Sequence, residues 1–121
     1  MITALVVEDS LTDLLVMTKC LQHGGHNVLT AKNGEEALAK ISSHKPDVII
    51  LDIVLPGRSG FELCRALKAE PGTSKIPVVI CSTKKTEMDK FWGLKQGADA
   101  YLAKPVDQEE LLRTVKQLIK G

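Results

Sequence analysis

The sequence predicts an α/β domain in which five strands alternate with five helices and form a doubly wound, five-stranded parallel sheet. The chain has 121 residues, a usual length for one domain. Short runs rich in β-branched residues recur along it, and longer stretches with apolar residues at helical spacing separate them. Because strands that alternate with helices form parallel sheets with right-handed crossovers, this pattern predicts helices on both faces of one sheet.

The first two strand–helix units occupy the N-terminal part of the chain. Residues 4–7 form the first expected strand, and the helix after it begins near Ser10, which has the spacing of a capping box with Asp13. Residues 28–30 form the second strand, and Asn33 marks the start of the second helix. Apolar residues continue both helices at the expected spacing: Leu14, Met17 and Leu21 in the first, and Ala37, Leu38 and Ile41 in the second.

The remaining three units follow the same pattern. Residues 48–51, 78–81 and 101–102 form the third, fourth and fifth expected strands. Gly97 ends the fourth helix, and Asp107 can cap the fifth. We expect all five strands to be buried on both faces, because helices cover both sides of a parallel sheet.

Charge and composition argue against several classes of protein. The 16 basic and 15 acidic residues nearly cancel, which disfavours binding to nucleic acid or to an acidic membrane. The apolar runs are far shorter than the roughly 20 residues that span a bilayer, and the N-terminus lacks the basic start of a signal peptide. A cytoplasmic protein is therefore expected. Cys20, Cys64 and Cys81 are far apart and form no CxxC pair, which predicts buried thiols rather than disulfides.

Polar side chains follow four of the expected strands at their carboxyl ends. Glu8 and Asp9 follow the first strand, and Asp52 follows the third. Ser82 and Thr83 follow the fourth strand, and Lys104 comes after the fifth. Open α/β sheets bind ligands beyond these ends of their strands. We therefore expect three carboxylates, two hydroxyls and an amine to converge on one site.

This combination of side chains suits phosphoryl transfer. Three carboxylates repel one another unless a cation joins them, and hard oxygen ligands of this kind suit Mg²⁺. Such an ion shields both the carboxylates and a phosphoryl group, so that an Asp oxygen can attack phosphorus. An amine beside the site supplies a second positive charge, and a hydroxyl can bond a phosphoryl oxygen.

Six short segments stand in order along the chain: Val6–Ser10, Asp47–Asp52, Leu55–Gly57 with Gly60, Ile76–Val78, Gly97–Tyr101 and Lys104–Pro105. Together they resemble the receiver domains of two-component signalling, the CheY-like family, over essentially the whole chain. The resemblance implies the strand order 2-1-3-4-5 of flavodoxin- and CheY-like folds. At about 4.8 Å between neighbouring strands, the fifth then lies about 10 Å from the third, a gap that the side chain of Lys104 can span. We expect one receiver domain over residues 1–121, with no output domain.

The resemblance assigns roles to the acidic residues. Asp52 is implied to be the phospho-acceptor. Asp9 and Asp52, with the backbone carbonyl of Val54, are implied to bind Mg²⁺, for which Mn²⁺ is the alternative ion. Glu8, which stands where Asp is common, is implied to act through a water of that ion. Val54 and Lys84 occupy positions that tune the lifetime of the acyl phosphate in the family.

The resemblance also assigns roles to the residues that would respond to phosphorylation. Ser82 is implied to hold a phosphoryl oxygen and to move on activation, and Lys104 to pair with the phosphoryl group. Tyr101 is implied to be an aromatic switch that turns inward when Ser82 moves. The peptide bond between Lys104 and Pro105 is implied to be cis.

Residues 83–98 carry a narrower resemblance, to the stand-alone PilH-type receivers of type IV pilus motility and chemotaxis-like systems. Within this stretch we expect one of Phe91 and Trp92 to pack against the sheet. The other is expected on the side of the fourth helix that faces a partner.

The predicted function is a response regulator in a motility or chemotaxis pathway rather than an enzyme, apart from self-dephosphorylation. A histidine kinase of the CheA type is expected to phosphorylate Asp52, and a downstream protein to bind the face made by the fourth and fifth helices and the fifth strand. The alternative is a receiver-like module that binds partners without phosphorylation. Two other classes of protein are disfavoured. A haloacid-dehalogenase-like phosphatase would need a second Asp where Val54 stands. A flavin-binding redox carrier of similar fold would bind phosphate after the first strand, where Glu8 and Asp9 would repel it.

Overall fold

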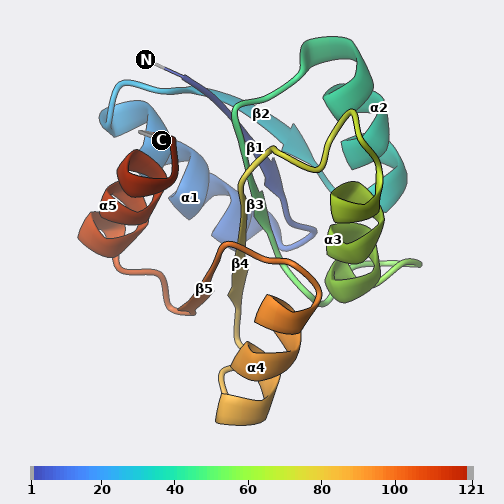
Figure 1. Cartoon of the computed structure of the whole chain (residues 1–121). Helices are drawn as coiled ribbons and strands as arrows, with labels where there is room; N and C mark the ends of the chain where they lie inside the picture. The colour runs from blue at the N-terminus through green and yellow to red at the C-terminus, as the bar shows by residue number, and fades with distance from the viewer. Residues whose placement is uncertain (1, 120–121) are drawn as a thin grey trace.

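Five strands alternate with five helices along the chain in the computed structural model, which describes residues 2–119 (Figure 1). The predicted strands are confirmed; β1 and β4 are longer by one residue at one end, and β2 and β5 by one residue at each end. The elements are β1 (Thr3–Val7), α1 (Leu11–His23), β2 (Asn27–Ala31), α2 (Gly34–His44), β3 (Val48–Leu51), α3 (Gly60–Ala69), β4 (Val78–Ser82), α4 (Glu87–Lys95), β5 (Ala100–Ala103) and α5 (Gln108–Ile119).

The strands form one parallel sheet in the order β2-β1-β3-β4-β5, as the resemblance implied. The central strands are aligned so that Val7 at the end of β1 lies beside Leu51 at the end of β3. At the other side of the sheet, Ser82 at the end of β4 lies beside Ala103 at the end of β5. This register brings the residues that follow β1, β3 and β5, together with the last residue of β4, to one edge of the sheet.

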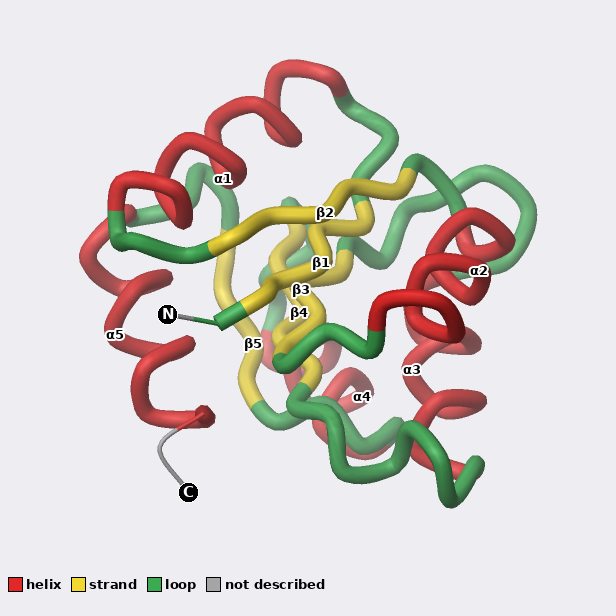
Figure 2. Tube along the Cα trace, turned by 90° about the horizontal axis from the view of Figure 1, so that it is seen from above, coloured by secondary structure: helices red, strands yellow, loops and turns green. Residues whose placement is uncertain are grey.

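Side chains that alternate along the strands build two cores, one on each face of the sheet. Leu5 and Val7 point to the face that α2 and α3 cover, whereas Ala4 and Val6 point to the face that α1 and α5 cover. Figure 2 shows this arrangement from above, with α1 and α5 on one side of the strands and α2 and α3 on the other. None of the helices within residues 2–119 is both long enough and apolar enough to cross a bilayer.

The expectation that every strand is buried on both faces is right for β4 and β3, nearly so for β1, and wrong for the two edge strands. In β2, Asn27 is exposed and residues 28–30 are only partly buried. In β5, Leu102 alone is buried, and its three neighbours are partly exposed. An edge strand has a neighbour on one side only, so the helices cover it less completely than they cover the centre of the sheet. The predicted burial of all three cysteines is confirmed, and all three thiols are free.

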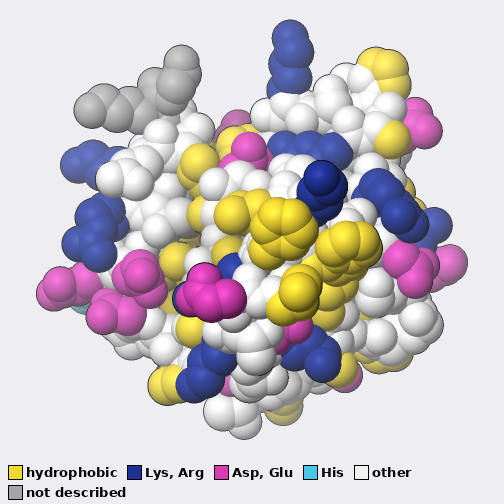
Figure 3. Space-filling model, turned by 60° about the horizontal axis from the view of Figure 1, so that its bottom comes forward, with side chains coloured by type: hydrophobic (Ala, Val, Ile, Leu, Met, Phe, Trp, Pro, Cys, Tyr) yellow, Lys and Arg dark blue, Asp and Glu magenta, His cyan; other side chains and the backbone are white. Residues whose placement is uncertain are grey.

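The expectation that one aromatic residue of α4 packs against the sheet is wrong. Phe91 and Trp92 are 58% and 48% exposed. Gly93 is the one buried residue of α4. The ring of Tyr101 and the side chain of Ile80 lie directly beneath it and leave no room for a larger residue at this position. Figure 3 shows the hydrophobic side chains that gather on this end of the molecule. We call Met88, Phe91, Trp92 and Leu94, all exposed, the α4 apolar surface.

Candidate functional site

The buried polar and charged residues within residues 2–119 all lie at one place. They are Glu8, Asp52, Ser82 and Lys104, and each stands at or just beyond the carboxyl end of a strand. The Asp52 N–H donates a hydrogen bond to the Val7 carbonyl at 3.1 Å, so Asp52 continues the alignment of β3 with β1. The Lys104 N–H likewise donates to the Ser82 carbonyl at 2.9 Å, beyond the end of β5. Parallel pairing therefore explains why these four residues converge, whereas Thr83, the second predicted hydroxyl, is exposed.

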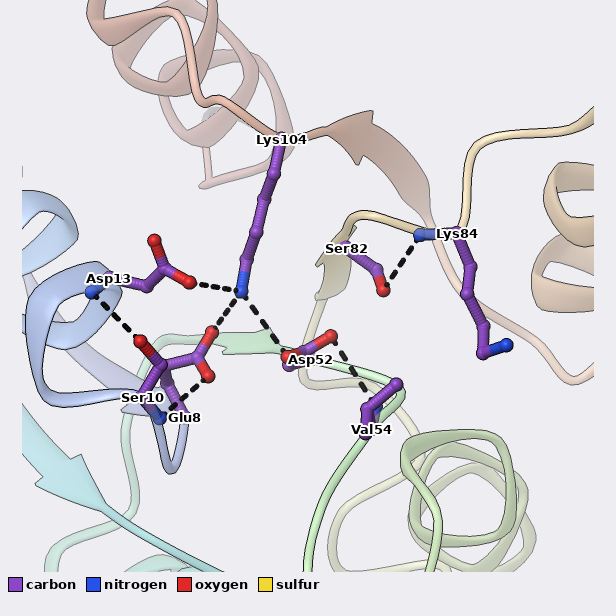
Figure 4. Close-up of polar contacts among 8 residues, drawn as sticks. All are labelled: Glu8, Ser10, Asp13, Asp52, Val54, Ser82, Lys84 and Lys104. Atoms are coloured by element: carbon purple, nitrogen blue, oxygen red, sulfur yellow. Dashed lines mark hydrogen bonds and ion pairs between the residues drawn. The ribbon is translucent and has the colours of Figure 1, made fainter.

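The ammonium group of Lys104 is the centre of this site (Figure 4). Its Nζ lies 2.5 Å from Glu8 Oε1 and 3.2 Å from Asp52 Oδ2. The Lys104 side chain thus spans the gap between the fifth and third strands, as its length allowed. The predicted cis peptide bond between Lys104 and Pro105 is also present. A buried carboxylate and a buried amine are each costly alone, so their pairing keeps both charges in the interior.

Asp13 is a third partner of Lys104, and the sequence interpretation did not assign it to the site. Its Oδ2 lies 2.9 Å from Lys104 Nζ. The expected capping box is therefore only half formed: Ser10 Oγ accepts from the Asp13 N–H at 3.4 Å, but the Asp13 carboxylate binds Lys104 instead of the Ser10 backbone. The Ser10 N–H donates to Glu8 Oε2 at 3.0 Å. Its contact with Lys104 joins residues 91 positions apart, which is why spacing along the chain provided no signal for it.

The charges around Lys104 change how it and Glu8 hold protons. Burial alone would lower the pKa of Lys104, but hydrogen bonds to Glu8 and Asp13 and the charge of Asp52 outweigh burial and raise it above its ordinary value. Lys104 is therefore charged at neutral pH. Burial raises the pKa of Glu8, and the charge of Asp52 adds to that effect, while hydrogen bonds from Lys104 and Ser10 oppose it.

Three carboxylates are close enough to share a metal ion. Glu8, Asp9 and Asp52 each offer an oxygen, and these oxygens all lie within 4.8 Å of one another. Asp9 is exposed while the other two are buried, so the group opens to solvent on one side. Oxygen donors with this charge fit Mg²⁺ or Mn²⁺. The Val54 N–H donates to Asp52 Oδ1 at 3.4 Å, and the side chain of Val54 is exposed.

Ser82 and Tyr101 both bind the backbone of Lys84. The Lys84 N–H donates to Ser82 Oγ at 3.3 Å, and the Tyr101 hydroxyl donates to the Lys84 carbonyl. A single residue in the loop after β4 therefore joins the hydroxyl in the site to the half-buried aromatic ring beside α4.

The loop between β3 and α3 approaches Asp52 closely at Gly60. The Gly60 N–H donates to the Ile53 carbonyl at 2.8 Å. A Cβ atom at position 60 would lie 2.1 Å from the Asp52 carbonyl oxygen and 2.7 Å from Ile53 Cα. Only glycine lets the start of α3 close against the end of β3, and this contact fixes the backbone of Asp52.

A sequence profile described as the response regulator receiver domain matches residues 4–116. Over 117 residues the chain is 47% identical to protein PilH of Pseudomonas aeruginosa, and the match covers 97% of each chain.

Solved structures agree with this match. The chemotaxis protein CheY4 of Vibrio cholerae superposes with a TM-score of 0.90 and is 34% identical, with 98% of each chain covered. The receiver domain of the sensor histidine kinase PA1611 from P. aeruginosa superposes with a TM-score of 0.91 at 26% identity, covering 99% of this chain and 98% of that one. The latter structure has a magnesium ion coordinated in its active site cleft.

Proposed function

Because the chain belongs to the response regulator receiver domain family, we propose that it is a phosphorylation switch in which Asp52 accepts a phosphoryl group. As a receiver domain of two-component signalling it implies a histidine kinase and a downstream effector as partners. The observation that carries the proposal is the buried Asp52 carboxylate, which lies 3.2 Å from the Lys104 ammonium among the other acidic residues of the site.

The proposed reaction is an attack of an Asp52 carboxylate oxygen on phosphorus. A lone pair of that oxygen forms the new O–P bond. With acetyl phosphate as donor, the old O–P bond breaks and its electron pair leaves with acetate. With a phosphohistidine donor, the P–N bond breaks and the departing imidazole nitrogen takes up a proton. Lys104 provides positive charge where the phosphoryl oxygens gather, and Ser82 Oγ offers them a hydrogen bond.

The proposed metal site consists of the carboxylates of Asp9 and Asp52 and the backbone carbonyl of Val54, with Glu8 in support. The three carboxylate oxygens within 4.8 Å of one another support this choice. When bound, Mg²⁺ or Mn²⁺ would supply the positive charge that offsets the carboxylates and the phosphoryl oxygens.

The proposed signal passes from Ser82 to Tyr101 through Lys84. If the Ser82 hydroxyl turns to a phosphoryl oxygen, the Lys84 N–H loses its acceptor and the loop that leads into α4 is freed to move. Tyr101, whose hydroxyl binds the Lys84 carbonyl, then loses its anchor and can turn inward. Phosphorylation would in this way shift the balance between two arrangements of the same elements.

The proposed partner face includes α4, β5 and α5. The α4 apolar surface supports it, because four large apolar side chains on one short helix are exposed there. The identity to PilH supports a role in type IV pilus motility or a related chemotaxis-like pathway, with a kinase of the CheA type as the donor.

The test is the intact mass of the protein after incubation with acetyl phosphate, with and without Mg²⁺, for the wild type and Asp52→Asn. We expect one phosphoryl adduct that needs Mg²⁺ and that the variant lacks. If the wild type gains no adduct from acetyl phosphate or from a CheA-type kinase while it stays folded, the chain is a binding module that works without phosphorylation.

A further inference from the structure

The hydrogen-bonding capacity of Lys104 is fully used by carboxylates. An ammonium group has three N–H donors. Nζ of Lys104 has three carboxylate acceptors, at 2.5 Å from Glu8, 2.9 Å from Asp13 and 3.2 Å from Asp52. A phosphoryl group on Asp52 can take over the contact that Asp52 already makes, but it gains a second hydrogen bond from Lys104 only if Glu8 or Asp13 gives way.

Glu8 and Asp13 differ in what their release would cost. Glu8 is 1% exposed, so losing Lys104 would leave a buried carboxylate without a cation, which is strongly unfavourable. The side chain of Asp13 is 41% exposed. Asp13 and Lys104 also line the same cleft of about 120 Å³ between α1 and the loop after β5, where water can replace the ammonium as the partner of Asp13. Of these two acceptors, Asp13 therefore leaves at the lower cost.

The direction in which Asp13 holds Lys104 also matters. In Figure 4, Asp13 and Glu8 approach the ammonium from the side on which α1 lies, whereas Asp52 approaches from the side of Ser82. The contact to Asp52 is the longest of the three. Asp13 thus holds the ammonium toward α1 and away from the position that a phosphoryl group on Asp52 would take.

We propose that Asp13 is a positioning residue that competes with the phosphoryl group for Lys104 and so restrains phosphorylation of Asp52. The inference rests on the proposed function. In the resting state Asp13 stabilises a position of Lys104 that the phosphorylated state gives up, and its negative charge repels an incoming anionic donor. Both effects act in the same direction, so removal of the charge speeds phosphorylation and strengthens binding of a phosphoryl mimic.

The test compares Asp13→Asn, Asp13→Glu and Glu109→Gln with the wild type at saturating Mg²⁺. Glu109 is exposed on the first turn of α5, so its variant controls for the loss of one negative charge. Two quantities are measured: the rate of phosphoryl incorporation from acetyl phosphate, by intact mass, and the affinity for beryllium fluoride, by calorimetry. Asp13→Asn should raise both about fivefold, the upper range for one partly exposed ion pair. Asp13→Glu should restore values near the wild type, and Glu109→Gln should stay near it.

The outcomes separate this inference from the proposed function. If the wild type is phosphorylated but folded Asp13→Asn reacts at the same rate or more slowly, the competition is refuted and the phosphorylation switch stands. If no variant, the wild type included, gains an adduct or binds beryllium fluoride, the proposed function fails and the inference fails with it. Asp13→Ser is a second variant without the charge, for use if Asn at this position disturbs the start of α1.

Discussion

The ring of Tyr101 occupies the space that a side chain at Gly93 would need. A Cβ atom at position 93 would lie 2.8 Å from Tyr101 Cδ2, 2.9 Å from Cε2 and 3.1 Å from Ile80 Cδ1. Because Gly93 has no side chain, the ring of Tyr101 can stay beneath α4, where its hydroxyl reaches the Lys84 carbonyl.

Gly93→Ala should expel the ring of Tyr101 from this place. The added methyl group collides with the ring, so we expect the Tyr101 side chain to turn, the hydrogen bond to Lys84 to break, and the free energy of unfolding to fall by about 1–3 kcal/mol. Urea unfolding and the NMR signals of the Tyr101 ring measure these changes. Gly72→Ala is the control, because a Cβ atom at position 72 meets nothing within 4 Å. An unmoved ring in a Gly93→Ala protein of unchanged stability would contradict the prediction.

Tyr101 should titrate well above an ordinary tyrosine. Burial chiefly, with the charges of Asp89 and Asp52, raises the pKa of Tyr101 to about 12. The chain has one tyrosine, so the ultraviolet absorbance of tyrosinate reports this residue alone. Since folding favours the neutral phenol, its contribution to stability is complete below the unfolded pKa of about 10 and is lost as pH rises toward 12. Asp52→Asn should lower the midpoint of this tyrosine titration. A wild-type titration midpoint near pH 10 would show that the ring of Tyr101 is not buried as described.

Binding of Mg²⁺ should stabilise the fold through the acidic residues. A ligand at about 100 times its Kd adds about 2.7 kcal/mol to the free energy of unfolding. We expect the midpoint of thermal unfolding to rise with Mg²⁺ concentration in the wild type and to respond far less in Asp9→Asn, which loses one of the three clustered carboxylates. Glu109→Gln is again the control for charge. Equal responses in Asp9→Asn and the wild type would place the ion elsewhere.

Gly60→Ala should destabilise the protein strongly. The new Cβ atom would collide with backbone atoms of Asp52 and Ile53, which cannot rotate away as a side chain can. We expect a loss of about 3 kcal/mol or more in the free energy of unfolding, at the upper end of the cost of overpacking. Chemical denaturation measures the loss. A change below about 0.5 kcal/mol, typical of a surface substitution, would show that the loop does not close on Asp52.

The link through Lys84 should be visible in the fluorescence of Trp92. This residue is the one tryptophan of the chain and lies on α4, which follows the Lys84 loop. Beryllium fluoride with Mg²⁺ should change its emission in the wild type. Ser82→Ala removes the hydroxyl that accepts from the Lys84 N–H, so it should weaken this change while beryllium fluoride still binds. Identical changes in both proteins would mean that the signal reaches α4 by another route.

The site could be predicted from the sequence to the extent that strand ends determine it. Glu8, Asp52 and Lys104 each follow a recognisable apolar strand, and parallel pairing then brings them together. The contact between Asp13 and Lys104 joins residues 91 positions apart and depends on where α1 lies against the sheet, which local pattern does not encode. The inward position of Gly93 was missed for a related reason. The large apolar residues of α4 predict an apolar face packed on the sheet. The ring of Tyr101 fills that space instead, so Gly93 faces the sheet and Phe91 and Trp92 are exposed.

The connection between Ser82 and Tyr101 is made by main-chain atoms of Lys84 on both sides. Lys84→Ala leaves the backbone N–H and carbonyl in place. Alanine scanning would therefore not detect the role of this residue in joining Ser82 to Tyr101. A substitution of the Lys84 side chain therefore leaves the connection intact. A change in the peptide unit itself, such as proline, which has no N–H to donate, is what would sever it.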